Sequence, residues 1–82
     1  MLEVHYFAGY REQLGLDREC LDWQPQLTSV DQLRQNLVAR GAAWSALAAQ
    51  NLMCACNQEL CGLDQVLQDG DEIAFFPPVT GG

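Results

Sequence analysis

The sequence is organised around its final run, Phe75-Phe76-Pro77-Pro78-Val79-Thr80-Gly81-Gly82. Prolines lack an N–H donor and fix φ, so a strand that reaches residue 76 cannot continue and leaves as a stiff, extended segment. The next two residues favour extended backbone, and the two glycines leave the terminal carbonyl unshielded. Such an end can enter a narrow channel. Because an ionised carboxylate is a poor electrophile at neutral pH, chemistry at Gly82 requires prior activation, for which an acyl-adenylate is the expected form.

The alternative is a frayed end, which is how many domains finish. The Gly-Gly pair follows the double proline by only two residues, as if on a measured spacer, and this favours a functional segment. We therefore predict a folded domain over residues 1–76 and a flexible, functional tail over residues 77–82. The predicted reacting residues are Gly82 and its neighbour Gly81.

Composition excludes several classes of protein. The 82 residues suffice for one domain, and a hydrophobic content of 49% is too high for a disordered chain. The net charge of −7 repels phosphate backbones, so we expect no nucleic-acid partner and a preference for a basic protein surface. No apolar stretch of about 18 residues is present, and the N-terminal region lacks a basic leader, so we expect no membrane span and a cytoplasmic location.

Hydrophobic periodicity and turn signals predict an α+β fold. The main helix starts at Thr28 or Ser29 and closes at Arg40-Gly41. Five strands are expected at 2–8, 20–23, 52–56, 60–61 and 72–76, with short helical segments at 10–14 and 42–50 and a turn or single helical twist at 63–67. This order suggests the β-grasp arrangement of ubiquitin-like proteins, a mixed sheet of about five strands packed on one main helix, with the last strand central and parallel to the first.

Groups for ordinary catalysis are scarce. His5 is the single histidine, it falls on the exposed side of a strand, and we expect it to be solvated. The four cysteines, Cys20, Cys54, Cys56 and Cys61, match no familiar zinc spacing, and we expect reduced, small buried side chains and no bound metal. Cys54 and Cys56 should share one face of a strand. We expect a subunit without catalytic groups or a bound cofactor of its own.

Nearly the whole chain resembles the MoaD-like sulfur carriers, the small subunits of molybdopterin synthase. The matching segments are Tyr6-Phe7-Ala8, Arg11-Glu12, Leu14-Gly15, Leu33-Arg34, Trp44, Ala55-Cys56-Asn57-Gln58 and the run from Asp69 to Gly82. The run from Phe75 to Thr80 is the specific part, because thiamin-pathway carriers and ubiquitin-like modifiers share the Gly-Gly end and usually lack this lead-in. Departures are confined to the middle of the chain, chiefly the cysteines and the alanine-rich helix.

The resemblance implies a reaction cycle in molybdenum cofactor biosynthesis. A ubiquitin-activating-like adenylyltransferase would use ATP to adenylate Gly82, and a sulfur donor protein would convert the product to a thiocarboxylate. The carrier would then insert its tail into the active site of a large subunit, within a heterotetramer, and pass sulfur to cyclic pyranopterin monophosphate. Two alternatives stay open: a thiamin-pathway sulfur carrier, and a modifier that forms amide bonds to lysines of other proteins.

The strand pattern also predicts where the large subunit docks. If Leu2, Val4, Tyr6, Ile73 and Phe75 face the core, then Phe7 and Phe76 lie on the outer face, with Leu60 as a third member. Scattered apolar residues on a surface are common. Their position beside the root of a functional tail favours an interface instead, because aromatic anchors carry much of the energy of such contacts. The predicted partner-binding residues are Phe7, Leu60, Phe76, Pro77, Pro78, Val79 and Thr80.

Overall fold

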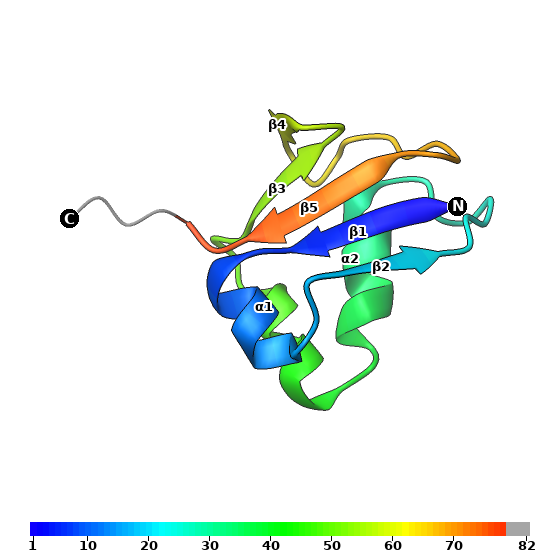
Figure 1. Ribbon diagram of the computed structural model, residues 1–82. Coiled ribbons are helices and arrows are strands. Elements are labelled where there is room, and N and C mark those ends of the chain that lie inside the picture. The colour runs from blue at the N-terminus through cyan, green and yellow to red at the C-terminus, as the bar shows by residue number, and fades with distance from the viewer. Residues whose placement is uncertain (79–82) are drawn as a thin grey trace.

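Five strands form a single mixed sheet with the helices on one side, as Figure 1 shows for this computed structural model, which describes residues 1–78. The sheet order is β2-β1-β5-β3-β4, and all neighbours are antiparallel except the central pair β1 and β5. This confirms the α+β, ubiquitin-like β-grasp prediction. The elements are β1 (Leu2–Tyr6), α1 (Ala8–Leu14), β2 (Arg18–Leu21), α2 (Val30–Val38), the 3₁₀ helix η1 (Ala42–Ala48), β3 (Met53–Cys56), β4 (Glu59–Cys61) and β5 (Glu72–Phe76).

The core lies between the sheet and α2, and it is built by strict alternation along the two central strands. Leu2, Val4 and Tyr6 of β1 are fully buried, as are Ile73 and Phe75 of β5. Parallel pairing places Val4 opposite Ile73 and Tyr6 opposite Phe75. Because side chains alternate between the two faces of a strand, this register sends every intervening residue to the outer face, the side of the sheet turned away from α2.

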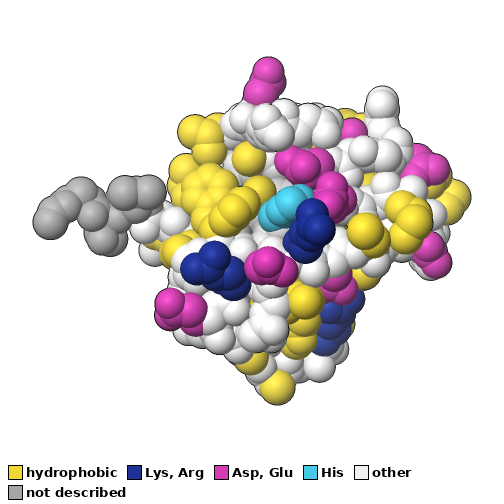
Figure 2. All heavy atoms as spheres, viewed as in Figure 1, with side chains coloured by type: hydrophobic (Ala, Val, Ile, Leu, Met, Phe, Trp, Pro, Cys, Tyr) yellow, Lys and Arg dark blue, Asp and Glu magenta, His cyan; other side chains and the backbone are white. Residues whose placement is uncertain are grey.

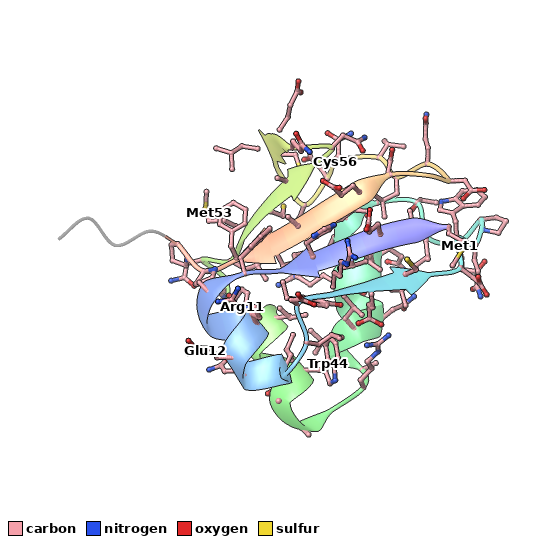
Figure 3. The ribbon with its side chains drawn as sticks, in the orientation of Figure 1. Met1, Arg11, Glu12, Trp44, Met53 and Cys56 are labelled. Atoms are coloured by element: carbon pink, nitrogen blue, oxygen red, sulfur yellow. The ribbon has the colours of Figure 1, made fainter. Side chains whose placement is uncertain are left out.

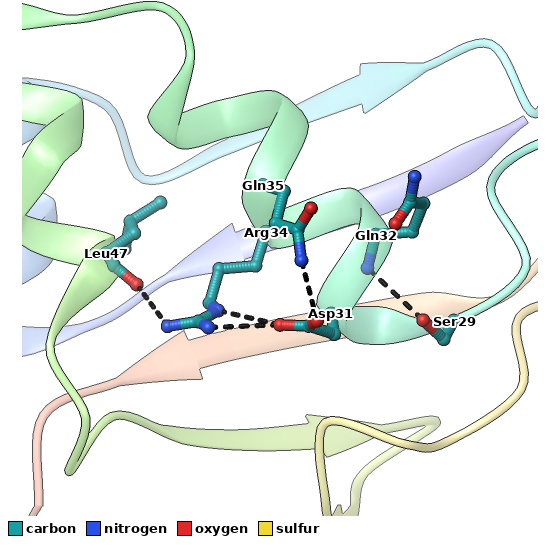
Figure 4. A network of polar contacts seen from close by, with 6 residues as sticks. All are labelled: Ser29, Asp31, Gln32, Arg34, Gln35 and Leu47. Atoms are coloured by element: carbon teal, nitrogen blue, oxygen red, sulfur yellow. Dashed lines mark hydrogen bonds and ion pairs between the residues drawn. The ribbon is translucent and has the colours of Figure 1, made fainter.

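Polar contacts hold the N-terminal half of the main helix (Figure 4). Ser29 is the N-cap, and its hydroxyl accepts a hydrogen bond from the Gln32 N–H at 3.2 Å. Arg34 pairs with Asp31 at 3.0 Å and also donates to the Leu47 carbonyl at 3.2 Å. The guanidinium therefore links the first turn of α2 to η1, which packs beside it.

Several predicted boundaries are wrong by about two residues: β1 ends at Tyr6 rather than residue 8, α1 begins at Ala8 rather than residue 10, and α2 ends at Val38, ahead of Arg40-Gly41. Two further differences have a local geometric cause. The second strand spans Arg18–Leu21 rather than 20–23, because the Tyr6 N–H donates to the Asp17 carbonyl at 2.9 Å and Val4 pairs with Glu19. These contacts fix the register of β2, and the next residues leave the strand.

The alanine-rich segment is a 3₁₀ helix over Ala42–Ala48 rather than a longer helix over 42–50. Its repeat of three residues per turn aligns Trp44 with Leu47, which is fully buried. Ala48 falls off that face and is exposed.

A polar contact ties the first strand to the second strand and the end of α2. The Tyr6 hydroxyl donates to Glu19 Oε2 at 2.9 Å, and Arg40 donates to both oxygens of the same carboxylate at 2.9 and 3.1 Å. Burial is the main cause of the raised pKa of Tyr6, so the hydroxyl stays protonated. The ring of Trp44 packs against this group, with the Arg40 guanidinium 4.4 Å from its centroid.

We expect Tyr6→Phe to lower the free energy of unfolding by about 1–2 kcal/mol, because it removes a hydrogen bond to a charged acceptor while leaving Glu19 paired with Arg40. Urea unfolding followed by circular dichroism measures this. Tyr10→Phe is the matched control, because Tyr10 is also buried and its hydroxyl has no hydrogen bond among the described residues. Equal losses in the two variants would contradict the role given to the Tyr6 hydroxyl.

Candidate functional site

The outer face of the sheet carries an apolar patch of four side chains at and near the end of β5. Phe7 is 46% exposed, Leu60 70% and Met53 38%, and Phe76 is half-buried between them. Antiparallel pairing puts Met53 directly opposite Phe76, and the Phe7 N–H donates to the Phe75 carbonyl at 3.1 Å. Figure 2 shows hydrophobic side chains gathered over this end of the sheet. The apolar patch is therefore Phe7, Met53, Leu60 and Phe76.

The structure places the sequence-predicted site residues in two groups. Phe7, Phe76 and Leu60 lie on the outer face as predicted, with Leu60 paired to Ala55 one strand further out. Pro77 and Pro78 follow β5 directly and are half-buried. The remaining predicted residues, Val79, Thr80, Gly81 and Gly82, lie outside the described residues, as does most of the predicted flexible tail.

Met53 belongs to the apolar patch and was not predicted from the sequence. The sequence predicts a strand over residues 52–56 without showing which side Met53 faces. In the structure β3 alternates, with Cys54 and Cys56 buried and Met53 exposed. Figure 3 labels Met53 and Cys56 at the two ends of β3, with Met53 at the end that lies beside the C-terminal end of β5. Its position opposite Phe76 depends on the β3–β5 register, which a single sequence does not reveal.

A polar group borders the apolar patch on the same face. His5 Nε2 lies 3.5 Å from a Glu72 oxygen and 3.6 Å from a Glu3 oxygen, and Arg18 lies 3.6 Å from that Glu3 oxygen. The His5 ring stacks on Phe7 with centroids 6.1 Å apart. Figure 2 shows the histidine between the yellow side chains and these charged groups. The prediction that His5 is simply solvated is wrong, because its neighbours cover Nε2, which is buried without a hydrogen bond inside residues 1–78.

The same polar group is the set best able to hold a cation in the described part of the chain. Ligand atoms of Glu3, His5 and Glu72 lie within 4.8 Å of one another. A carboxylate pair around one imidazole is equally the arrangement of an ordinary ion pair, and exposed acidic groups commonly cluster without a metal. The absence of a bound metal stays a prediction.

The cysteines divide into two kinds. Cys54 and Cys56 are buried and share the core side of β3, as expected, and Cys61 of β4 is partly buried. Cys20 of β2 is exposed, so the expectation of a buried side chain is wrong there. Its strand is an edge strand whose alternation places Cys20 on the open side of the sheet.

We expect Cys20 to be alkylated by iodoacetamide much faster than the other thiols of the native protein at neutral pH. Burial is the largest cause of the raised pKa values of Cys56, about 11, and of Cys61, about 12. Their reactive thiolate forms are therefore scarce at neutral pH. Peptide mapping of briefly labelled protein checks this, with Cys20→Ser as the control. Rapid labelling of Cys61 at neutral pH would contradict it.

Taken together, the five-stranded mixed sheet, the parallel central pair and the helix packed beneath them define a ubiquitin-like β-grasp protein. Residues 4–82 match the ThiS family, and the chain belongs to that family. A relative from Escherichia coli (strain K12), the "Molybdopterin synthase sulfur carrier subunit", is 43% identical over 83 residues, and the match covers 100% of both chains.

Solved structures of similar proteins have the same fold. SAMP1 from Haloferax volcanii superposes with a TM-score of 0.80 and 26% identity, covering 99% of this chain and 98% of the other. A "Protein-protein complex of subunit 1 and 2 of Molybdopterin-converting factor" from Helicobacter pylori contains a chain that matches with a TM-score of 0.67 and 26% identity, covering 99% and 97%. Within residues 1–78, no helix combines the length and hydrophobicity needed to cross a bilayer.

Proposed function

We propose that this chain is the sulfur carrier subunit of a molybdopterin synthase and that Gly82 carries the sulfur. The observation that supports this most directly is the full-length similarity to the E. coli sulfur carrier subunit, at 43% identity. The fold is compatible with the role, because β5 is a central strand held on both sides, by β1 and β3. The segment that follows β5 therefore begins at a point that both neighbouring strands hold in place.

In the proposed cycle, an adenylyltransferase transfers AMP from ATP to the Gly82 carboxylate and releases pyrophosphate. Sulfur supplied by a donor protein then displaces AMP and leaves a thiocarboxylate, a soft sulfur nucleophile. Inside the large subunit the thiocarboxylate gives its sulfur to cyclic pyranopterin monophosphate. The carrier contributes the tail, and the large subunit contributes the acid, base and anion-binding groups. Because the first step consumes ATP, we place the cycle in the cytoplasm.

The proposed docking surface for the large subunit is the apolar patch. Aromatic and other large apolar side chains commonly anchor such interfaces, and here they surround the end of β5 from which the tail departs. The solved complex of subunits 1 and 2 from H. pylori contains a chain of the same fold, which supports a two-subunit assembly. The net charge of −7 favours a basic surface on the partner.

Intact-mass measurement tests the carrier function. The purified chain is incubated with ATP, the activating enzyme of the same cell and a sulfide source, and a parallel sample lacks ATP. The expected result is a mass gain equal to the replacement of one oxygen by sulfur, only when ATP is present. A chain that becomes adenylated and never gains sulfur, or that gains sulfur without ATP, would contradict the proposal.

A second candidate is a protein modifier, and the similarity to SAMP1, a small archaeal modifier protein, is the observation that favours it. A modifier would become attached to lysines of other proteins through Gly82. Conjugates that survive a denaturing gel and contain this chain would support the modifier, whereas sulfur transfer to a pterin substrate without conjugates would support the carrier. A thiamin-pathway carrier would also gain sulfur and would differ in its acceptor.

We expect Phe7→Ala, Leu60→Ala and Phe76→Ala each to weaken binding to the large subunit by about 1–3 kcal/mol, because each removes an anchor from the apolar patch. Calorimetric titration measures the affinity, and melting curves show whether the fold survives. Val66→Ala is the control, since Val66 is 61% exposed and pairs with Ser29 ahead of α2 rather than within the five-stranded sheet. Three variants that bind like the unmodified chain would show that the docking surface lies elsewhere.

A further inference from the structure

Two thiols face each other across the β3–β4 hairpin at one edge of the sheet, where Figure 1 shows these strands side by side. Cys54 is directly opposite Cys61 in the antiparallel register, and their sulfur atoms are 3.8 Å apart. The Cys61 thiol donates toward Cys54 Sγ, and the Cys54 thiol donates to the Cys61 carbonyl oxygen at 3.3 Å. The two side chains are thus already turned toward each other.

The backbone allows these sulfurs to become bonded. Directly opposed residues of antiparallel strands have Cα atoms about 4.5–5.5 Å apart, within the range of about 4.4–6.8 Å that disulfides span. The other cysteines are placed differently. Cys56 is opposite Glu59 rather than a thiol, and Cys20 lies on β2 at the other edge of the sheet.

We propose that Cys54 and Cys61 are a redox site, at which a peroxide converts the two thiols into a reversible cross-strand disulfide. In the first step Cys61 Sγ attacks a peroxide oxygen, which breaks the O–O bond, forms a sulfenic acid and releases water. In the second step Cys54 Sγ attacks the Cys61 sulfur, forming the S–S bond and releasing a second water. The two thiols lose two electrons and two protons, and the peroxide takes up both.

Access to the surface assigns the first step, the attack on peroxide, to Cys61. A surface hollow of about 260 Å³ can admit a small oxidant and is lined by Cys61 and also by Cys56. Of these two thiols, only Cys61 lies directly opposite another thiol. Cys54 is only 2% exposed and can act mainly as the resolving thiol. Burial raises the pKa of both thiols, so the reaction is slow at neutral pH and the pair responds to sustained exposure.

The expected product has a structural consequence. The new bond ties β4, a three-residue edge strand, to β3. Disulfides in reducing compartments are usually transient and redox-sensing, and a thiol reductant should reverse this one.

The test uses the full chain with Cys20→Ser, which removes the exposed thiol that could link two molecules. After peroxide treatment, free thiols are blocked under denaturing conditions and the chain is cleaved after Glu59, which separates Cys54 and Cys56 from Cys61. The expected result is the loss of two hydrogen atoms and a pair of fragments that stay joined until a thiol reductant is added. Adding Cys56→Ala should leave the link intact, and adding Cys54→Ala should abolish it.

Three results would overturn the proposal. The first is a link that persists without Cys54, which would make Cys56 the partner. The second is Cys61 carrying added oxygen without a link in the Cys56→Ala protein. The third is no change at all under a peroxide exposure prolonged far beyond the time that fully oxidises Cys20 in the unmodified chain. Because each variant is scored by the position of a covalent bond, the readout does not depend on sulfur carriage.

Discussion

Deleting Gly82 is expected to abolish thiocarboxylate formation completely while leaving the thermal unfolding of the domain unchanged. The proposed chemistry takes place at the carboxyl carbon of this residue, so its removal places the carboxylate one residue short of the activating enzyme's reacting groups. Misplacing reacting atoms by even about 1 Å can cost roughly a hundredfold in rate. The core, in contrast, is complete by Phe75, which is fully buried.

The experiment compares the deletion with the unmodified chain and with Gln68→Ala in the same mass assay. Gln68 is exposed and lies ahead of β5, at the opposite end of that strand from the tail, so its replacement should allow normal sulfur loading. Sulfur loading of the shortened chain would show that the reacting carboxylate is not that of Gly82. A large fall in melting temperature would show that the tail supports the fold.

Phe75→Ala is expected to lower the free energy of unfolding by about 3–5 kcal/mol, the usual cost of deleting a buried phenylalanine ring. Phe75 has no exposed surface, and it lies opposite Tyr6 on one side and Cys54 on the other. Its ring is stacked near that of Tyr6, with centroids 6.5 Å apart. A small domain is stable by only about 5–15 kcal/mol, so the variant would lose a large part of its stability.

The adjacent residue provides the matched control for this prediction. Phe76→Ala removes the same side chain from the outer face, where the ring is only half-buried, and should cost the fold much less. Urea unfolding of both variants gives the comparison. If the two substitutions were equally destabilising, the separation of the two aromatic rings into a core residue and a docking residue would be wrong.

The sequence predicted the fold well where the pattern is strong. The run from Glu72 to Phe76 matches β5 in full. The alternation of Leu2, Val4 and Tyr6 identified β1, which ends two residues before its predicted end, and the core face of both strands is confirmed. The helix start was predicted at Thr28 or Ser29 and is found at Ser29, because capping depends on a few local residues.

The sequence was less informative where partners distant in the chain decide the structure. The extent of β2 depends on its pairing with β1, and the exposure of Met53 depends on its pairing with β5. The covering of His5 depends on Glu3 and Glu72, which come from two different strands. The hydrophobic pattern of one segment says nothing about these neighbours, because register is a property of two strands together.

The parallel pairing of β1 and β5 has a consequence for the time course of folding. It joins Glu3 to Glu72, so nearly the whole chain must be closed into a loop before the two central strands can meet. Loop-closure entropy opposes such contacts, and domains that depend on them fold more slowly than those built from neighbouring segments. The β3–β4 hairpin and α2 are local and can form early. The rate-limiting event we infer is the insertion of β5 between β1 and β3, and until it occurs the apolar sides of both neighbours lack their central partner and are open to association with other unfolded chains.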